Sequence, residues 1–150
     1  MNKQVLIEYM AFKPLPQSLQ EAKLNPNKNY IGIDIKGARF WRGAKTAIEE
    51  KLEKDDSIAA FVMESGAQMA GGVIIYPKNH QNEISKICKK NNVLFVLDEI
   101  ATGFGRLGSM IEYKKQNSVP DIVSFGKMLT GGYQTFAATL TTKKITESFL

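Results

Sequence analysis

Three short apolar runs that each end in an ionisable residue constrain the fold of this chain most strongly. The runs end at Glu64, Asp98 and Lys127. Val93 to Leu97 is apolar at every position, which is typical of a strand buried on both faces in a parallel sheet. Because ligands bind beyond the carboxyl ends of the strands in such sheets, we expect the three ionisable side chains to lie near one another there.

Helical patterns lie between the apolar runs. From Gly43 to Lys54 the charged residues fall on one face, and the apolar residues on the other are Ala44, Ala47, Ile48 and Leu52. After Asn79, which can cap a helix, the expected inner face is Ile84, Ile87 and Cys88. The alternation of strand and helix predicts an α/β fold with a mostly parallel sheet and right-handed crossovers.

The two ends of the chain differ in regularity. The first 40 residues are turn-rich and predict loop, so we expect residues 1–57 to be a loop-rich segment plus one helix that leads into the core. Residues 58–150 are expected to form the α/β core itself. Its last strand, Phe136 to Leu140, follows Lys127 too closely for a helical crossover, which predicts an antiparallel strand.

Composition excludes several classes of protein. With 150 residues, of which 43% are hydrophobic and 23% charged, the chain suits one ordinary globular domain. No apolar run approaches the roughly 20 residues that span a bilayer, and the first residues do not resemble a signal peptide, so we expect a cytoplasmic location. The single cysteine, Cys88, and the single histidine, His80, provide neither a disulfide nor a metal site. We interpret them as core filler and as a first-turn residue of a helix.

The net charge of +5 does not indicate a nucleic-acid partner. The lysines stand in short groups between acidic residues, as on a solvated surface, and aromatic residues are not interleaved with them. We therefore expect small-molecule ligands, and neither nucleic acid nor a membrane.

Asp98 and Lys127 carry the most informative chemistry. Removing these two charged side chains from water costs free energy unless an opposite charge or a ligand is near. Two structural roles are possible: a buried Asp98–Lys127 ion pair, or a turn capped by the aspartate. The functional role is to bind pyridoxal phosphate, whose aldehyde would form an imine with the lysine and whose ring nitrogen the aspartate would keep protonated. A low-dielectric site would favour the deprotonated amine of Lys127.

The glycine-rich segment after Asp98 offers a competing interpretation. Its sequence, Gly-Phe-Gly-Arg-Leu-Gly over residues 103–108, matches the pattern of dinucleotide-binding loops. In dinucleotide-binding loops the first glycine follows the strand directly, whereas here five residues separate the apolar run from the first glycine. The next strand also ends in Lys127 rather than in an acid that would bind a ribose. Dinucleotide binding is therefore the weaker alternative.

Two segments resemble the signature of class III aminotransferases. They read Leu-Asp-Glu-Ile-Ala-Thr-Gly-Phe-Gly-Arg over residues 97–106 and Gly-Lys-Met-Leu-Thr-Gly-Gly over residues 126–132. The resemblance implies part of the large domain of a fold-type-I enzyme that uses pyridoxal 5'-phosphate. It makes Lys127 the catalytic, cofactor-binding lysine, Asp98 the partner of the pyridine nitrogen, and Glu64 an acid on the cofactor side of the pocket.

Within this family, Ala101 is similar to the branch that makes 7,8-diaminononanoate for biotin, because other branches usually have glutamine there. Residues 138–142 resemble the same branch. The resemblance implies amino transfer to 7-keto-8-aminopelargonate, with S-adenosylmethionine or lysine as donor, in a homodimeric parent enzyme. A class III aminotransferase for ornithine or another ω-amino acid is the alternative.

Two features depart from the family pattern. Ser65 follows Glu64 where the family usually has proline, and Met69 follows Gln68 where it usually has glycine. Family members are also several times longer, and the segments that would bind the cofactor phosphate and the substrate carboxylate are not in this sequence. We therefore expect an internal, truncated piece of the enzyme without activity of its own.

Overall fold

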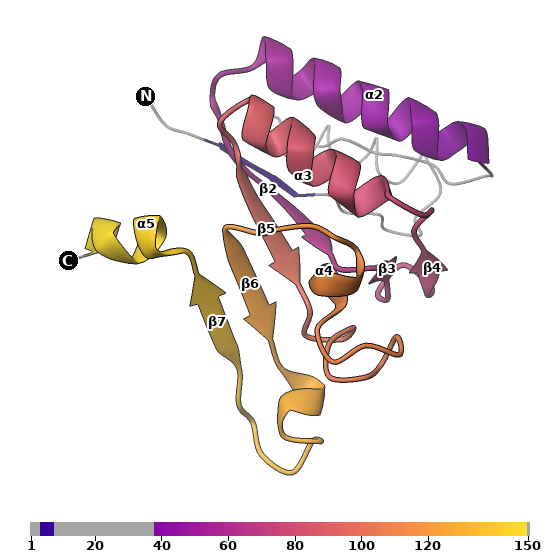
Figure 1. The fold of residues 1–150 in the computed structure, drawn as a ribbon, viewed down its shortest axis with the longest axis vertical. Helices are drawn as coiled ribbons and strands as arrows, with labels where there is room; N and C mark the ends of the chain where they lie inside the picture. The colour runs from indigo at the N-terminus through magenta and orange to yellow at the C-terminus, as the bar shows by residue number, and fades with distance from the viewer. Residues whose placement is uncertain (1–3, 8–37, 150) are drawn as a thin grey trace, which may run out of the picture.

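A computed structural model describes residues 4–7 and 38–149 of the chain. Its main sheet has the strand order β1-β2-β5-β6-β7 (Figure 1). The strands are β1 (Gln4–Ile7), β2 (Ile58–Glu64), β5 (Leu94–Asp98), β6 (Ile122–Phe125) and β7 (Ala138–Thr141). The first four are parallel, and β7 is antiparallel to β6. The prediction of a mostly parallel sheet with an antiparallel last strand is confirmed.

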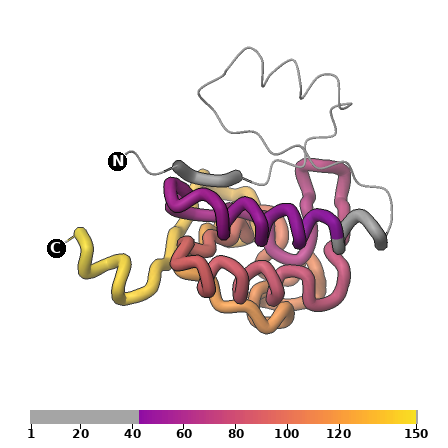
Figure 2. The backbone as a smooth tube through the Cα atoms, turned by 90° about the horizontal axis from the view of Figure 1, so that it is seen from above, coloured from indigo at the N-terminus to yellow at the C-terminus, as the bar shows by residue number. Residues whose placement is uncertain are grey.

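Two helices cover one face of this sheet. They are α2 (Ala38–Lys54) and α3 (His80–Lys90), which lie side by side in both views (Figures 1 and 2). The shorter elements are β3 (Ala67–Gln68), β4 (Ile74–Ile75), α4 (Glu112–Lys115), the 3-10 helix η1 (Lys127–Leu129), α5 (Lys143–Thr146) and the 3-10 helix η2 (Glu147–Phe149). β3 and β4 pair with each other as an antiparallel ladder after β2.

A hydrophobic cluster fills the space between the two helices and the sheet. Its helical members are Ile48, Leu52, Ile84, Ile87 and Cys88, and its strand members include Phe61, Met63, Phe95, Leu97, Val123 and Phe125. On the opposite face of β5, Leu94 and Val96 are only half-buried. The expectation that both faces of β5 are buried therefore holds for one face within the described residues, because α2 and α3 lie on the same side.

Strand β1 was not expected. Its residues fall in a segment whose turn-rich sequence predicted loop, but they pair in parallel with β2, with Ile7 beside Val62. Pairing with a distant strand satisfies the backbone groups of this segment. Its only local signal is the three-residue apolar run from Val5 to Ile7, which is too short to predict a strand by itself. The rest of the expected loop up to residue 37, which is residues 1–3 and 8–37, lies outside the described residues.

The two main helices differ in detail from their predicted forms. α2 begins at Ala38 rather than at Gly43, and Ala47 is exposed instead of facing the core. Successive side chains of a helix point about 100° apart, so Ala47 points away from the buried face that contains its neighbour Ile48. Asn79 does not cap α3 with its side chain, because its backbone is left-handed at φ 69°.

Cys88 and His80 are both buried in α3, as the sequence interpretation required. Burial raises the pKa of the Cys88 thiol to about 12 and lowers the pKa of His80 to about 4. Among the described residues, no group of three or more histidine, cysteine or acidic side chains is placed to hold a metal ion. No described helix is long and apolar enough to cross a membrane.

The buried histidine makes stability depend on pH. Burial lowers the pKa of His80 from 6.5 to about 4, so the unfolded state binds its proton more tightly, and stability present above pH 6.5 is lost as the pH falls toward 4. A phenylalanine at this position keeps a ring beside Tyr76 but cannot titrate. We predict that between pH 7 and 4.5 the free energy of unfolding falls by roughly 2 kcal/mol more in the native protein than in His80→Phe. Urea unfolding of both proteins at both pH values checks this prediction. An equal loss of unfolding free energy in the native protein and in His80→Phe would contradict it.

Candidate active site

The register of the parallel strands brings polar side chains to one edge of the sheet. Glu64 of β2 is opposite Asp98 of β5, which in turn is opposite Ser124 of β6. Residues opposite one another in register point to the same face, and here that face is the one away from the hydrophobic cluster. Lys127 comes three residues after Ser124, at the first position of η1. The convergence expected from the strand ends is therefore present.

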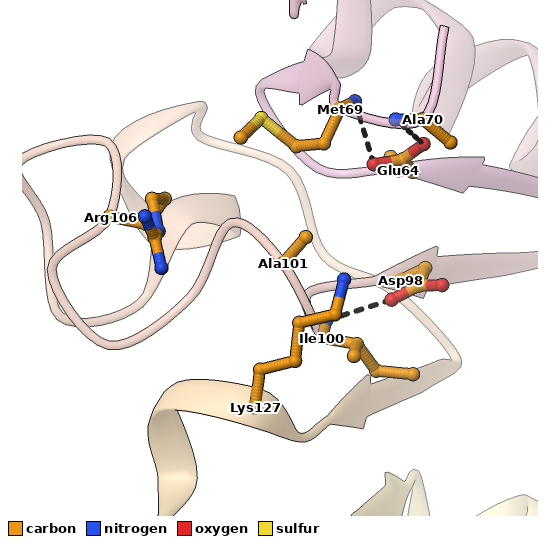
Figure 3. A pocket seen from close by; sticks show the side chains of 8 residues that line it. All are labelled: Glu64, Met69, Ala70, Asp98, Ile100, Ala101, Arg106 and Lys127. Atoms are coloured by element: carbon orange, nitrogen blue, oxygen red, sulfur yellow. Dashed lines mark hydrogen bonds between the residues drawn. The ribbon is translucent and has the colours of Figure 1, made fainter. Parts of the chain in front are cut away.

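Glu64, Asp98 and Lys127 line a common cavity of about 330 Å³, a size within the range of small-molecule sites. The complete lining is Glu64, Met69, Ala70, Asp98, Ile100, Ala101, Arg106 and Lys127. In Figure 3, Lys127 reaches toward the end of the strand that carries Asp98, while Glu64 and Arg106 lie on other walls. The cavity is thus formed by the segments that follow β2, β5 and β6.

Asp98 and Lys127 do not form the ion pair that the sequence allowed. Asp98 Oδ1 accepts a hydrogen bond from the Ile100 N–H at 2.7 Å, which confirms the turn-capping role for one carboxylate oxygen. Within the described part of the chain, neither a hydrogen bond nor an ion pair reaches the Lys127 amine or the second Asp98 oxygen. Both groups are therefore available to a ligand.

The surroundings of Lys127 correct one expectation. Its side chain is exposed in this structure, whereas a low-dielectric environment was expected for the amine. The cause is its position on η1, beyond the end of β6 and outside the hydrophobic cluster.

The backbone at Lys127 is in an uncommon conformation. Its φ of 40° lies in the left-handed region, which costs a residue other than glycine about 1–3 kcal/mol. The preceding residue, Gly126, is tightly placed, because a Cβ there would lie 3.2 Å from Ile100 Cγ2 and the Ile100 side chain would have to shift. The Gly-Lys pair thus lets the chain pass close to Ile100 and turn at once into η1. Strain of this kind is often found at functional positions.

Glu64 contributes to the cavity mainly through the loop that follows it. Its Oε2 accepts from the Met69 N–H at 2.8 Å, and its Oε1 accepts from the Ala70 N–H at 3.3 Å (Figure 3). The sequence predicted an acid at the pocket, and the structure places one there. Both carboxylate oxygens, however, are already engaged in holding the loop wall.

The glycine-rich loop after β5 does not form a dinucleotide-binding turn. Its amides bond within the loop, with the Gly105 N–H donating to the Ser109 carbonyl at 2.9 Å and the Gly108 N–H to the Gly105 carbonyl at 3.0 Å. The helix that follows, α4, begins only at Glu112, so its N-terminus does not continue this turn. The dinucleotide interpretation is therefore wrong. The loop instead carries Arg106, an exposed cation that the sequence analysis did not select, to the cavity wall.

Glu99 anchors this loop and was also missed. Its side chain is fully buried, and its carboxylate accepts from the Glu112 N–H at 3.0 Å and the Tyr113 N–H at 2.6 Å. Two backbone donors compensate a buried carboxylate that forms no ion pair with any residue the structure describes. The signal in the sequence was a second acid directly after Asp98, at a strand end expected to be buried.

The comparisons with known proteins give the family. The family model described as Aminotransferase class-III matches residues 10–150. This chain belongs to the class III aminotransferases. The adenosylmethionine-8-amino-7-oxononanoate aminotransferase of Staphylococcus aureus is 47% identical over 106 residues, and that of Buchnera aphidicola from Schizaphis graminum is 40% identical over 119 residues. The matches cover 70% and 79% of this class III chain, but only 24% and 26% of the relatives.

Solved structures agree with the family assignment. An ornithine delta-aminotransferase from Plasmodium falciparum superposes on 96% of this class III chain with a TM-score of 0.74 and 27% identity, and 32% of that chain is covered. The ornithine aminotransferase of Plasmodium yoelii has 40% identity and a TM-score of 0.64 over 67% of this chain and 26% of its own. The class III chain therefore spans about a quarter of the length of the curated relatives, and its fold is that of PLP-dependent transaminases.

The role of Glu99 in holding the glycine-rich loop can be tested by replacing its carboxylate with an amide. Glu99→Gln retains the shape of the side chain but replaces one of the two carboxylate oxygens with an NH2 group, so one of the two backbone N–H groups faces a donor instead of an acceptor. We predict a loss of about 1–3 kcal/mol in the free energy of unfolding, because a buried donor is left without its acceptor. The matched control, Glu147→Gln, breaks only the exposed pair with Lys143 and should change stability by less than about 1 kcal/mol. Equal losses in denaturant titrations would contradict the role of Glu99.

Proposed function

We propose that this protein transfers amino groups with pyridoxal phosphate bound between Asp98 and Lys127. The observation that carries the proposal is the arrival of a carboxylate and a primary amine at one cavity from the ends of adjacent parallel strands. The two groups do not neutralise each other, so each can contact a different end of a single ring. The family of the chain supports the same chemistry.

The residues present fit this cofactor. The cavity volume suits a small ring, and the second oxygen of Asp98 has no hydrogen-bond partner among the described residues. When bound, pyridoxal phosphate supplies an electron sink for the pair of electrons left on the substrate carbon. The Asp98 carboxylate would hold the proton on the ring nitrogen through its negative charge. The loop held by Glu64 would bound the ring on one side.

Lys127 would act twice. Its Nζ would hold the cofactor covalently through the aldehyde carbon, and a donor amine would displace it from there. The released Nζ would then take a proton from the substrate carbon as a general base and deliver it, as a general acid, to the carbon that had carried the aldehyde. Because Lys127 is exposed at the cavity, its amine is accessible to both the ring and an incoming donor.

The proposed acceptor is 7-keto-8-aminopelargonate, in biotin biosynthesis, with S-adenosylmethionine or lysine as the donor. Ala101 supports this choice because it lines the cavity at the position where other branches of the family usually carry glutamine. The names of the two curated relatives described above support it too. The second candidate is an ornithine-type aminotransferase, which the 40% identity to the Plasmodium yoelii enzyme favours.

Because the chain spans about a quarter of its relatives' length, we assign this activity to the whole protein. We propose that the whole protein is a homodimer in the cytoplasm and that residues 58–150 form its cofactor-binding core. Tests of activity should therefore use the protein expressed from its complete coding frame.

Covalent attachment at Lys127 is the first prediction of this proposal. Borohydride reduction in the presence of pyridoxal phosphate should fix the cofactor on Lys127, as read by peptide mass spectrometry. Lys127→Ala should lose the adduct and reduce turnover to background while the protein stays folded. The control Lys86→Ala removes an exposed lysine of α3 and should change neither result. Retained turnover in Lys127→Ala would refute the assignment.

The charge of Asp98 is the second prediction. Asp98→Asn keeps an oxygen for the Ile100 N–H but removes the negative charge. We predict a fall in kcat on the order of 100-fold, typical of losing one group that stabilises transition-state charge. Circular dichroism should report an unchanged fold. Full activity in this variant would show that the ring nitrogen does not depend on Asp98.

Product analysis separates the two candidate substrates. The whole protein should convert 7-keto-8-aminopelargonate to 7,8-diaminononanoate with one of the two donors and should not act on ornithine. Turnover of ornithine alone would select the second candidate.

A further inference from the structure

A buried polar cluster adjoins the loop that forms one wall of the cavity. Gln81 of α3, Ser65 after β2 and Ser118 before β6 are 0%, 0% and 3% exposed. Gln81 Nε2 donates to Ser65 Oγ at 3.1 Å and to Ser118 Oγ at 2.8 Å. Its Oε1 accepts from the Gly66 N–H at 2.7 Å. One side-chain amide thus joins three segments that are far apart in the sequence.

The cluster is fully hydrogen-bonded. Ser118 Oγ donates onward to the Tyr113 carbonyl at 3.3 Å. The side-chain polar atoms of Ser65, Gln81 and Ser118 are not among the buried atoms of the described residues that lack a partner. A satisfied network of this kind fixes distances and directions, whereas apolar side chains would fill the same volume without doing so.

The network holds Gly66 on both sides. Its N–H donates to Gln81, and its carbonyl accepts from the Tyr76 N–H at 3.2 Å. Gly66 has φ 74°, and a Cβ at this position would lie 2.6 Å from Glu112 Cγ. The loop that leaves Gly66 supplies the amides that bind the Glu64 carboxylate. The position of that cavity wall therefore follows from the position of Gly66.

Ser65 connects the same network to Asp98. Its N–H donates to the Asp98 carbonyl at 3.0 Å, which extends the β2–β5 ladder by one bond. The family usually has proline at this position, and proline has no N–H to donate. The fixed φ of proline would stiffen the loop locally. Here the Ser65 N–H donates to β5, and the Ser65 hydroxyl accepts from Gln81 of α3.

We propose that Gln81 is a positioning residue for the active site. Through Ser65 and Gly66 it sets where the Glu64 wall of the cavity stands relative to Asp98, and so where the cofactor ring is held. The part that concerns the ring rests on the proposed function, whereas the part that concerns the loop does not.

The test compares Gln81→Met with the native whole protein. Methionine keeps the length of the side chain but leaves the Gly66 N–H and two serine hydroxyls without their partner. Amide hydrogen exchange at Met69 and Ala70 should become about tenfold faster, and affinity for pyridoxal phosphate about tenfold weaker, as expected for an unpaired buried group. The visible circular dichroism of the bound ring should change as well. Ser118→Ala, which spares the contact with Gly66, should have a smaller effect in the same direction.

The control is Cys88→Ala, which removes a fully buried side chain on the same helix outside the cavity. It should lower the melting temperature. It should not change the amide exchange rates of Met69 and Ala70 relative to global unfolding, and it should not change the visible circular dichroism of the bound ring. The proposal is overturned if Gln81→Met leaves the exchange at these amides unchanged, or if Cys88→Ala changes it equally. It is also overturned if exchange accelerates while cofactor affinity and ring signal stay the same.

Failure of the proposed function gives a different result. A native protein that binds no pyridoxal phosphate would refute the proposed function, yet the exchange rates would still decide whether Gln81 holds the loop.

Discussion

The backbone ladder that joins β2, β5 and β6 is the constraint on which the rest of the structure depends. It pairs Glu64 with Asp98 and Asp98 with Ser124, so the polar strand ends fall on one face. A slip of one residue would send a strand's side chains to the opposite face. Burial prevents this slip, because the pairs in register just before the site, such as Met63 and Leu97, are both inside the hydrophobic cluster.

Buried polar side chains fix the positions of the loops that follow the strands. Glu99 fixes the end of the glycine-rich loop through backbone amides, and Gln81 does the same for the loop after β2. Neither uses a surface ion pair, which would be weak and sensitive to salt. The site thus combines a rigid sheet edge with loops whose ends are fixed from within the protein. Such support keeps reactive groups in place without requiring the loops themselves to be buried.

The sequence was sufficient where the physical cause is local. Unbroken apolar runs mark buried strands, so the strand ends at Asp98 and Glu64 could be located. It was insufficient where the cause is a distant partner. Strand β1 exists through its pairing with β2, and the roles of Glu99 and Gln81 depend on groups 13 to 37 residues away. The exposed amine and left-handed backbone of Lys127 likewise depend on how the chain passes Ile100.

The buried thiol of Cys88 has a practical consequence. A thiol whose pKa is about 12 is almost entirely protonated at neutral pH, and its fully buried position denies access to alkylating reagents. Since this chain has no other cysteine, one introduced at the rim of the cavity would be the preferred point of attachment for a maleimide dye or a nitroxide. Spectroscopic reporters could therefore follow events at the strand ends in a chain that keeps its native cysteine.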